Sequence, residues 1–407
     1  MVCRMCGSDR LETYFDMGLH PPADEFRRKD QLANPVVHYP LEVCLCLDCG
    51  LSQLTYVVDP EVLYRHDYPY EASTTATGRK HFADFAETVS TRLDLKAGDL
   101  VVDVGSNVGV LLEAFRNRGA KVLGVEPASN IARLAEKRGI ETLNEFFSAD
   151  LAAQIRASHG QAAVITGSNV FAHVDDLNSF MRAVDGLLSG SGVFIFESPD
   201  MLSLVKNLEY DTIYHEHLSY LSLKPVVRFC ARHGMEVFDV QKQTIHGGSF
   251  RVYIARRGAR PVLPAVAAAL EEEERFNLHS IETMRAFASR AFENRDKLLW
   301  LLRSLKHDGA HIAALSAPAK GMSLLNFCRL GRETIDFATE KSTLKIGRYT
   351  PGDNIPVLPD SALLERMPSH ALLLAWNFSA EIMANMSEYR RRGGKFIIPV
   401  PEPRIVS

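Results

Sequence analysis

The sequence predicts an α/β protein in which a small cysteine-rich unit precedes a doubly wound parallel sheet and a second α/β unit. Three observations support this fold class. Five of the seven cysteines lie within the first fifty residues. Apolar strand-like segments alternate with helical segments from about residue 99 to residue 257, and the same alternation returns after residue 309. We place the domains at residues 1–72, 73–260 and 261–407.

The composition fits a soluble globular protein of this size. The chain has 407 residues, of which 46 are Lys or Arg and 50 are Asp or Glu, so its formal net charge is −4. At roughly 150 residues per domain, a chain of this length forms two or three domains. This charge offers no field to hold a polyanion, so nucleic acid is not an expected partner. The N-terminus shows no apolar leader, and no uncharged run nears the ~20 residues of a membrane helix, so we expect a cytoplasmic protein with no membrane partner.

The first unit carries two C-x-x-C pairs, Cys3 with Cys6 and Cys46 with Cys49, and each pair is followed by a glycine. A glycine eases the turn that brings both thiols of a pair onto one ion. Four thiolates form a closed tetrahedral zinc site without a free position for catalysis, so we expect a structural Zn²⁺. Cys44 is then a spare thiol. The alternative is a set of redox-active or incidental cysteines.

The central unit begins with a helix over residues 70–95. Its parallel sheet is predicted by four apolar segments with helices between them, and residues 235–257 predict two antiparallel strands at one edge. The predicted strands are residues 100–105, 120–126, 162–170 and 192–198, and the predicted helices are residues 108–119, 128–139 and 176–188.

The third unit follows a break in the pattern at Pro261 to Pro264. Residues 280–309 predict a long amphipathic helix, and a second α/β alternation comes after it. Its predicted strands are residues 311–317, 334–340, 371–377 and 395–401, and its predicted helices are residues 320–330 and 379–394.

The most informative motif is Asp103-x-Gly105-x-x-x-Gly109, which lies between the first strand of the central sheet and its helix. Gly105 allows a tight turn against a ligand, and Gly109 lets the helix start close to the strand. The spacing differs from the G-x-G-x-x-G of pyrophosphate sites and suits an adenosyl ligand, while Glu126 ends the next strand where a carboxylate accepts hydrogen bonds from ribose hydroxyls. This pairing resembles S-adenosylmethionine-dependent methyltransferases with a Rossmann-like fold; a glycine-rich turn without a ligand is the alternative. The expected cofactor residues are Asp103, Gly105, Asn107, Gly109, Glu126 and Asn169.

Titratable and aromatic side chains are concentrated in the segment 209–223, EYDTIYHEHLSYLSL. His215 and His217 are two residues apart, whereas the helix of a zinc protease needs histidines four apart, so we expect acid–base chemistry here. Asn169 and His173 follow one predicted strand, and Glu197 ends the next. Because the carboxyl ends of parallel strands meet at one edge, these groups gather beside the cofactor. A structural role is the alternative for any single histidine.

Motifs along the whole chain resemble one family. They are the C-x-x-C pairs, YPYEAS, VDVGSNVG, SNVFAH, YDTIYHEHLSY, HGGSFRVY, APAKG, GRYTPG and LAWNF. They are similar to those of the sugar C-methyltransferases of deoxysugar biosynthesis, which implies a zinc-binding domain, a methyltransferase domain and a C-terminal α/β domain, with a nucleotide-linked keto-deoxysugar bound between them. The resemblance implies that His217 is the general base, with Tyr214 and Glu216 beside it. The residues that it implies around the sugar are Asn169, His173 and Tyr68.

Further substrate contacts are expected on loops. Lys320 lies at a strand-to-helix turn, where helix amides and the lysine charge favour a diphosphate. Arg348 and Tyr349 lie on a polar loop, from which they reach phosphate or base or are simply solvated. His246 belongs to the H-G-G motif, whose role stays unassigned. The expected substrate contacts are Tyr70, Glu197, His246, Lys320, Arg348 and Tyr349.

The expected reaction is methylation of C3 beside a C4 ketone, on a nucleotide-linked sugar and by preference a dTDP-sugar. A carbon next to a ketone is methylated after it loses a proton, so the site needs a base with a pKa near working pH, which histidine supplies. Tyr214 and Asn169 offer hydrogen bonds to the enolate oxygen. Two alternatives stay open: a methyltransferase for a sugar oxygen or amine, and a zinc- and S-adenosylmethionine-binding module without turnover. A monomer and a small homo-oligomer are both compatible with the sequence.

Overall fold

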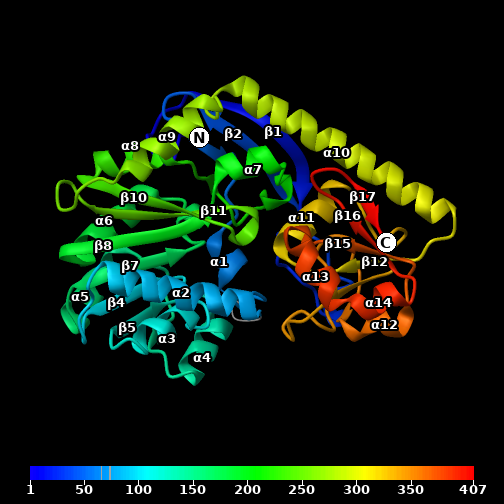
Figure 1. Cartoon of the computed structure of the whole chain (residues 1–407), viewed down its shortest axis with the longest axis horizontal. Helices are drawn as coiled ribbons and strands as arrows, with labels where there is room; N and C mark the ends of the chain where they lie inside the picture. Colours follow the sequence, from blue (N-terminus) through cyan, green and yellow to red (C-terminus); the bar gives the residue numbers. More distant parts are fainter. Residues whose placement is uncertain (66, 73–74) are drawn as a thin grey trace.

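The computed structural model describes residues 1–65, 67–72 and 75–407, and of His246 only the backbone. The described residues form three sheets, of four, seven and six strands (Figure 1). The helices among them include none with the length and apolar character that a membrane span requires.

The four-stranded sheet has the order β1-β2-β3-β9 and is antiparallel throughout. Its strands are β1 (Leu11–His20), β2 (Tyr39–Cys46), β3 (Ser52–Leu54) and β9 (Ser219–Tyr220). Strand β9 comes from the segment 209–223 of the central unit, and its Tyr220 is paired with Ser52. Backbone hydrogen bonds therefore attach the predicted acid–base segment to the cysteine-rich unit.

The seven-stranded sheet has the order β10-β11-β8-β7-β4-β5-β6. Its strands are β4 (Leu100–Val104), β5 (Lys121–Val125), β6 (Thr142–Leu143), β7 (Ala162–Ser168), β8 (Leu188–Pro199), β10 (Met235–Gln243) and β11 (Ser249–Arg256). Strands β8, β7, β4, β5 and β6 are parallel; at one edge β11 is antiparallel to β8, and β10 is antiparallel to β11. The predicted doubly wound sheet and its antiparallel pair are confirmed.

Helices cover and connect the strands of this sheet. They are α1 (Pro60–Tyr64), α2 (Ala76–Arg92), α3 (Val110–Arg116), α4 (Ser129–Lys137), α5 (Ala149–His159), α6 (Leu177–Leu187), α7 (Met201–Asn207) and α8 (Leu223–Arg232). Helix α2 starts later than the predicted residue 70, because the Thr75 hydroxyl caps it by accepting a hydrogen bond from the Gly78 amide at 3.0 Å. Residues 73–74 of the predicted helix lie outside the described residues.

The third unit contains the six-stranded sheet, in the order β14-β13-β12-β15-β16-β17. Its strands are β12 (Ile312–Leu315), β13 (Phe337–Glu340), β14 (Val357–Pro359), β15 (His370–Leu373), β16 (Lys395–Ile398) and β17 (Arg404–Val406). Its helices are α10 (Ile281–His307), α11 (Ala319–Phe327), α12 (Ser361–Arg366), α13 (Ser379–Asn385) and α14 (Ser387–Arg391), whereas α9 (Pro264–Arg275) packs on β10 and α8 of the central unit. The predicted strand over 371–377 ends at Leu373, and the helix predicted over 379–394 is divided at Met386.

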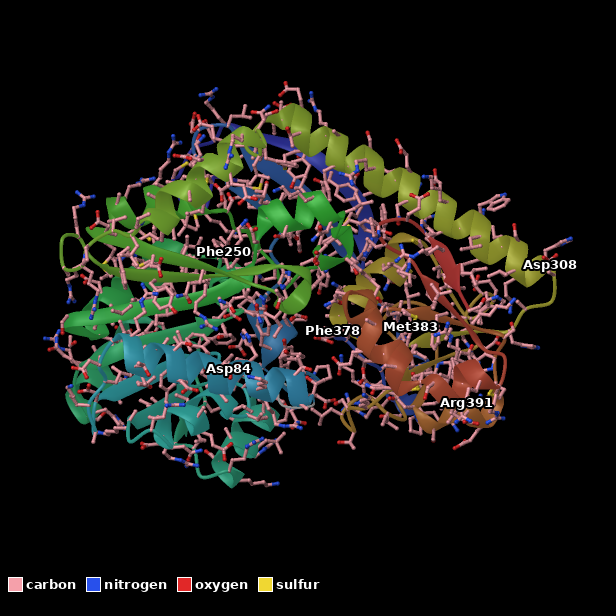
Figure 2. The ribbon with its side chains drawn as sticks, viewed as in Figure 1. Asp84, Phe250, Asp308, Phe378, Met383 and Arg391 are labelled. Carbon is pink, nitrogen blue, oxygen red and sulfur yellow. The ribbon has the colours of Figure 1, made fainter. Side chains whose placement is uncertain are left out.

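One hydrophobic core joins the first and third units. The ring of Phe15 in β1 makes edge contacts with Phe287 of α10 and Phe327 of α11, each at 5.8 Å between centroids. Figure 1 shows α10 running from the N-terminal strands to the C-terminal unit. Figure 2 places Phe378 on the side of that unit that faces the central sheet, and Asp308 at its far end. The central and C-terminal units are thus held at a set orientation on either side of the acid–base segment.

Candidate active site and metal centre

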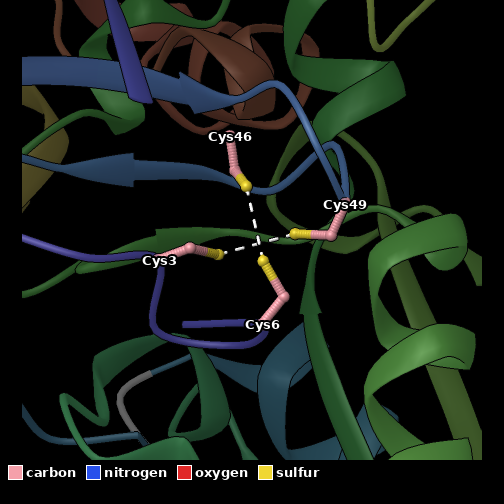
Figure 3. Close-up of side chains that lie close together, drawn as sticks. All are labelled: Cys3, Cys6, Cys46 and Cys49. Atoms are coloured by element: carbon pink, nitrogen blue, oxygen red, sulfur yellow. Dashed lines mark hydrogen bonds between the residues drawn. The ribbon is translucent and has the colours of Figure 1, made fainter. Parts of the chain in front are cut away.

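Four thiols converge at the start of the chain (Figure 3). The Sγ atoms of Cys3, Cys6, Cys46 and Cys49 all lie within 4.8 Å of one another. This spacing and this donor set fit one tetrahedrally coordinated Zn²⁺, so the predicted structural zinc site is confirmed. Cys44 points elsewhere, since its thiol donates to the Gln53 carbonyl at 3.5 Å.

The turn after β4, residues 105–109, is the one that the sequence motif predicts to hold the cofactor, and we call it the cofactor loop. Gly105 has φ 65°, and a Cβ there would lie 2.3 Å from Cγ2 of Val170, so only glycine fits. The backbone amides of Asn107 and Ala128 each donate to one oxygen of the Glu126 carboxylate at 2.9 Å. Burial raises the pKa of Glu126 to about 7, although these two hydrogen bonds act to lower it. Each oxygen keeps a further lone pair, which suits a ribose diol.

Two other expected cofactor residues support the loop through neighbouring strands. The Asp103 carboxylate in β4 accepts a hydrogen bond from the Thr166 hydroxyl in β7 at 2.6 Å, and burial raises its pKa to about 7. Asn169 adopts φ 56° directly after β7, and its backbone N–H donates to the backbone carbonyl of Glu197 at 2.7 Å. The carboxyl ends of β4, β5, β7 and β8 therefore bring these predicted residues to one edge of the sheet.

Both ring nitrogens of His217 are engaged by hydrogen bonds. Its Nδ1 lies 2.8 Å from the Thr212 carbonyl oxygen, and its Nε2 lies 2.9 Å from the Tyr214 hydroxyl. A carbonyl only accepts, so Nδ1 carries the proton and Nε2 accepts from Tyr214. The two rings are packed with 4.1 Å between centroids, and His217 is buried. The site thus presents an imidazole of defined tautomer next to a phenol.

A second histidine and a tyrosine extend this cluster. The rings of His173 and His217 are 5.1 Å apart, and Tyr64 of α1 is stacked on His173 at 6.0 Å with 9° between the planes. Burial lowers the pKa of His173 well below its usual value, and the neighbouring His217 lowers it further. His173 is therefore neutral beside His217. Tyr64 was not among the predicted site residues.

Glu216 faces a different set of partners. It accepts a hydrogen bond from the Tyr68 hydroxyl at 3.0 Å and is buried. Burial and the nearby Asp24 raise the pKa of Glu216 to about 8, while Tyr68 and Lys345 lower it. Asp24 of the first unit and Lys345 of the third form a buried ion pair at 3.1 Å. Residues of the first and third units therefore set the charge of Glu216, which belongs to the central unit.

Several expected substrate contacts are held by other side chains. Glu197 accepts hydrogen bonds from Arg251 at 2.9 Å and from His81 at 2.5 Å; although burial raises its pKa, these two partners lower it overall. The Lys320 Nζ lies 3.9 Å from the Asp211 carboxylate and 4.7 Å from the Trp376 ring centre.

The remaining expected substrate contacts lie on the loops. Both terminal nitrogens of Arg348 donate to the Asp67 carboxylate at 2.8 Å, and the Tyr349 backbone is paired with Arg27. Tyr70 is 41% exposed. The side chain of His246 lies outside the described part of the chain.

Five residues that contact the site were not predicted from the sequence, because distant parts of the chain supply them. They come from five separate stretches of the chain and are Asp24, Tyr64, His81, Arg251 and Lys345. The aromatic residues at 64, 68 and 70 were a usable signal for Tyr64. The other four are charged or titratable residues without a distinctive motif, so the sequence gives no indication of which distant residues they contact.

The chain is similar to known proteins along its whole length. Three family models match in order along the chain: "Putative zinc binding domain" over residues 3–64, "Methyltransferase domain" over 76–240 and "C-methyltransferase C-terminal domain" over 244–401. C-methyltransferase NovU of Streptomyces niveus is 38% identical over 406 residues, which cover 100% of this chain and 96% of that protein. The chain belongs to the C-methyltransferase family. The family expected from the sequence motifs is confirmed, whereas the exact domain boundaries stay a prediction.

Other relatives match this C-methyltransferase over less of its length. The ubiquinone biosynthesis O-methyltransferase of Bordetella avium is 30% identical over 103 residues, 25% of this chain and 43% of that protein. Among solved structures, magnesium protoporphyrin IX methyltransferase of Synechocystis with bound S-adenosylmethionine covers 44% of this chain and 81% of its own, at 14% identity and a TM-score of 0.34. A methyltransferase of Clostridium acetobutylicum covers 44% and 92%, at 16% identity and a TM-score of 0.36.

Proposed function

We propose that this C-methyltransferase uses S-adenosylmethionine to methylate C3 of a nucleotide-linked 4-keto-deoxysugar by way of an enolate. The observation that carries the proposal is the pair of hydrogen bonds on the His217 imidazole. Because Nδ1 donates to a carbonyl, the lone pair lies on Nε2, which can remove a proton from a carbon acid once the Tyr214 hydroxyl turns away from it.

His217 and its neighbours account for the movement of the proton. Nε2 takes the proton from C3, and the Thr212 carbonyl stabilises the resulting imidazolium at Nδ1. The Tyr214 hydroxyl, 2.9 Å from Nε2, turns to the ketone oxygen before this step; the turn frees the Nε2 lone pair and gives the developing enolate oxygen a hydrogen bond, with Asn169 as a second donor. His173 stays neutral because burial lowers its pKa, so it adds no charge opposing the imidazolium.

The cofactor residues supply position rather than chemistry. S-adenosylmethionine, when bound, provides the electrophilic methyl group. Gly105, Gly109 and Asn107 would shape the loop around it, and Glu126 would accept hydrogen bonds from its ribose. Asp103 ties β4 to β7 beneath the loop. Alignment of the methyl group with the reacting carbon is the main contribution of this edge of the sheet.

The substrate part of the proposal names a dTDP-sugar. Tyr68, Asn169 and His173 would line the sugar, and Lys320 would reach the diphosphate from the N-terminus of α11. We retain a cytoplasmic monomer or small homo-oligomer as part of the proposal. The other residues proposed around the nucleotide or sugar are Tyr70, Glu197, His246 and Tyr349.

Hydrogen exchange at the reacting carbon tests this function. A dTDP-linked 4-keto-deoxysugar is incubated with the enzyme in D₂O, with S-adenosylhomocysteine in place of the methyl donor. We expect deuterium at C3 with the wild type and only the enzyme-free background with His217→Asn. The exposed His311→Asn serves as the matched control and should exchange normally.

Product analysis with the methyl donor distinguishes the alternatives. A methyl group on an oxygen or nitrogen, formed without exchange at C3, would identify a sugar O- or N-methyltransferase and contradict the proposal. The absence of any product from a panel of nucleotide-linked 4-keto sugars would favour a binding module without turnover.

A further inference from the structure

A short segment lies across the cofactor loop and is fixed to it by side-chain amides. We call residues 67–72 the strap. The Asn107 side chain, in the loop, accepts a hydrogen bond from the Ala72 amide at 2.9 Å and donates to the Tyr70 carbonyl at 3.2 Å. The backbone amide of the same Asn107 donates to Glu126. The strap and the expected ribose acceptor are therefore joined through one residue.

The strap is also fixed to helix α4. The Tyr68 amide donates to the Asn130 side chain at 3.1 Å, and that side chain donates back to the Tyr68 carbonyl at 2.8 Å. This double hydrogen bond sets the position of the Tyr68 backbone, while the Tyr68 hydroxyl extends to Glu216 at 3.0 Å. One residue thus connects the cofactor edge with the acid–base segment.

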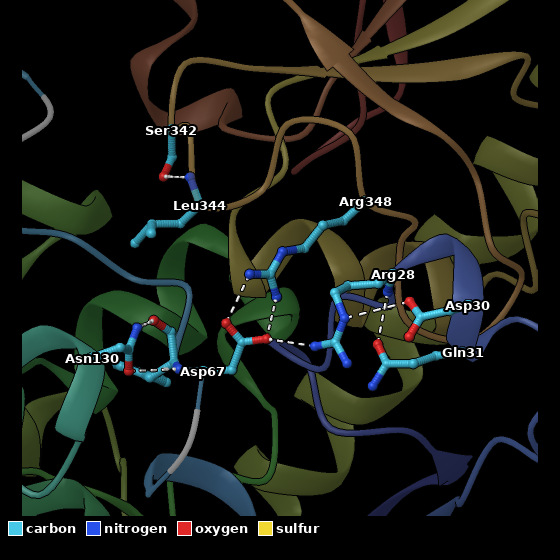
Figure 4. Close-up of polar contacts among 9 residues, drawn as sticks. Arg28, Asp30, Gln31, Asp67, Asn130, Ser342, Leu344 and Arg348 are labelled. Carbon is cyan, nitrogen blue, oxygen red and sulfur yellow. Dashed lines mark hydrogen bonds and ion pairs between the residues drawn. The ribbon is translucent and has the colours of Figure 1, made fainter.

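Asp67, the first residue of the strap, is anchored to another part of the first unit and to the third unit (Figure 4). Both carboxylate oxygens accept hydrogen bonds from Arg348 of the third unit at 2.8 Å, and Arg28 of the first unit donates to one of them at 3.2 Å. Asp67 has φ 58°, a conformation that an aspartate keeps only when its surroundings hold it. A bidentate pair of this kind fixes direction as well as distance.

Apolar packing supports the same arrangement. Leu344, four residues before Arg348, lies with Tyr68 against the cluster that contains Val108 and Ala128. The loop that carries Leu344 and Arg348 also carries Lys345, which is paired with Asp24. The third unit therefore contacts the strap through the charged pair at Asp67, and its Leu344 packs against the same apolar cluster as Tyr68.

We propose that Asp67 is a positioning residue, which Arg348 and Arg28 hold so that the strap covers the cofactor loop and the Tyr68 hydroxyl reaches Glu216. This inference rests on the proposed function for its effect on turnover, but not for its effect on ligand binding. It also gives Arg348 a role other than the substrate contact expected from the sequence, because its guanidinium is committed to Asp67.

Binding of S-adenosylhomocysteine, measured by calorimetry, tests the strap without any sugar substrate. We expect Asp67→Asn and Arg348→Gln to weaken binding by about tenfold, since they release a segment that orders the loop. Deuterium uptake by the strap amides, measured by mass spectrometry, should rise in the same variants. Arg348→Lys keeps the charge without the bidentate geometry and should recover part of the affinity, and the exposed Arg332→Gln should match the wild type.

A double-mutant cycle separates positioning from general destabilisation. Asp67→Asn should lower kcat by about tenfold in the wild type but have little further effect in a Tyr68→Phe background, because both act through the same hydroxyl. Wild-type affinity and wild-type amide exchange in both Asp67→Asn and Arg348→Gln would overturn the inference, as would equal losses of kcat in the two backgrounds. If affinity and exchange change as expected while the wild type methylates no sugar, the strap stands and the proposed substrate fails.

Discussion

The Nδ1 atom of His217 lies 2.8 Å from the carbonyl oxygen of Thr212, five residues earlier in the same segment. This contact decides the chemistry of the other ring nitrogen, because a histidine that donates at Nδ1 accepts at Nε2. Thr212 belongs to the short helical turn of residues 210–212, and β9 follows at Ser219. The backbone on both sides of His217 is therefore held by hydrogen bonds.

Removal of the Tyr214 hydroxyl should impair turnover with little loss of stability. Tyr214→Phe keeps the ring packed on His217 but removes the donor proposed for the enolate oxygen. We expect kcat to fall by about 10²- to 10³-fold, the range seen for single oxyanion donors. Steady-state kinetics and the thermal midpoint check this prediction. Unchanged kcat would remove Tyr214 from the mechanism.

The pKa of Glu216 predicts a dependence of stability on pH. Its pKa is about 8 in the folded protein and near 4.5 in the unfolded chain, so the folded state binds the extra proton between these values. Stability from this group is therefore present at low pH and is lost as pH rises toward 8.

Glu216→Gln should remove this loss, which is on the order of a few kcal/mol. We expect the thermal midpoint of the variant to fall less than that of the wild type between pH 6 and pH 9. Glu365→Gln, at an exposed position of α12, is the control and should follow the wild type. Parallel curves for all three proteins would disprove the assignment.

Cysteine replacement should separate the metal ligands from the spare thiol. Cys46→Ser removes one of four zinc ligands, so we expect loss of bound zinc and a lower thermal midpoint. Cys44→Ser is a closely matched control, two residues away in the same strand, and should retain one zinc per chain. The zinc content of both variants is measured by inductively coupled plasma mass spectrometry. Full zinc content in Cys46→Ser would contradict the four-thiolate site.

The cofactor loop should not tolerate a side chain at Gly105. Gly105→Ala places a methyl group 2.3 Å from Val170 at φ 65°, a strain of about 1–3 kcal/mol. We expect weaker binding of S-adenosylhomocysteine by calorimetry, with partial recovery when Val170→Ala is added. Gly186→Ala, in α6 with open space at its Cβ, should bind normally. Normal binding by Gly105→Ala would show that the loop is not part of the ligand site.

Local patterns in the sequence predicted much of the fold and the centre of the site. The strand-to-helix turn at Gly105 and the acidic end of the next strand predicted the sheet edge, because the order of strands in a doubly wound sheet brings their carboxyl ends together. The break at Met386 and the early end of β15 at Leu373 were missed, because in short segments tertiary packing overrides propensity.

The sequence by itself predicted the zinc ligands, the cofactor turn and the histidine-rich segment, since each carries a short local motif: two C-x-x-C pairs, a glycine-rich turn and a dense run of titratable residues. Only the tertiary structure decided what surrounds them. The tautomer of His217, the partners that raise the pKa of Glu216 and the pairing of Arg348 with Asp67 depend on contacts between distant segments. Charge and hydrogen bonding act through space over a few ångströms, and sequence spacing does not record which distant groups the fold brings within that range.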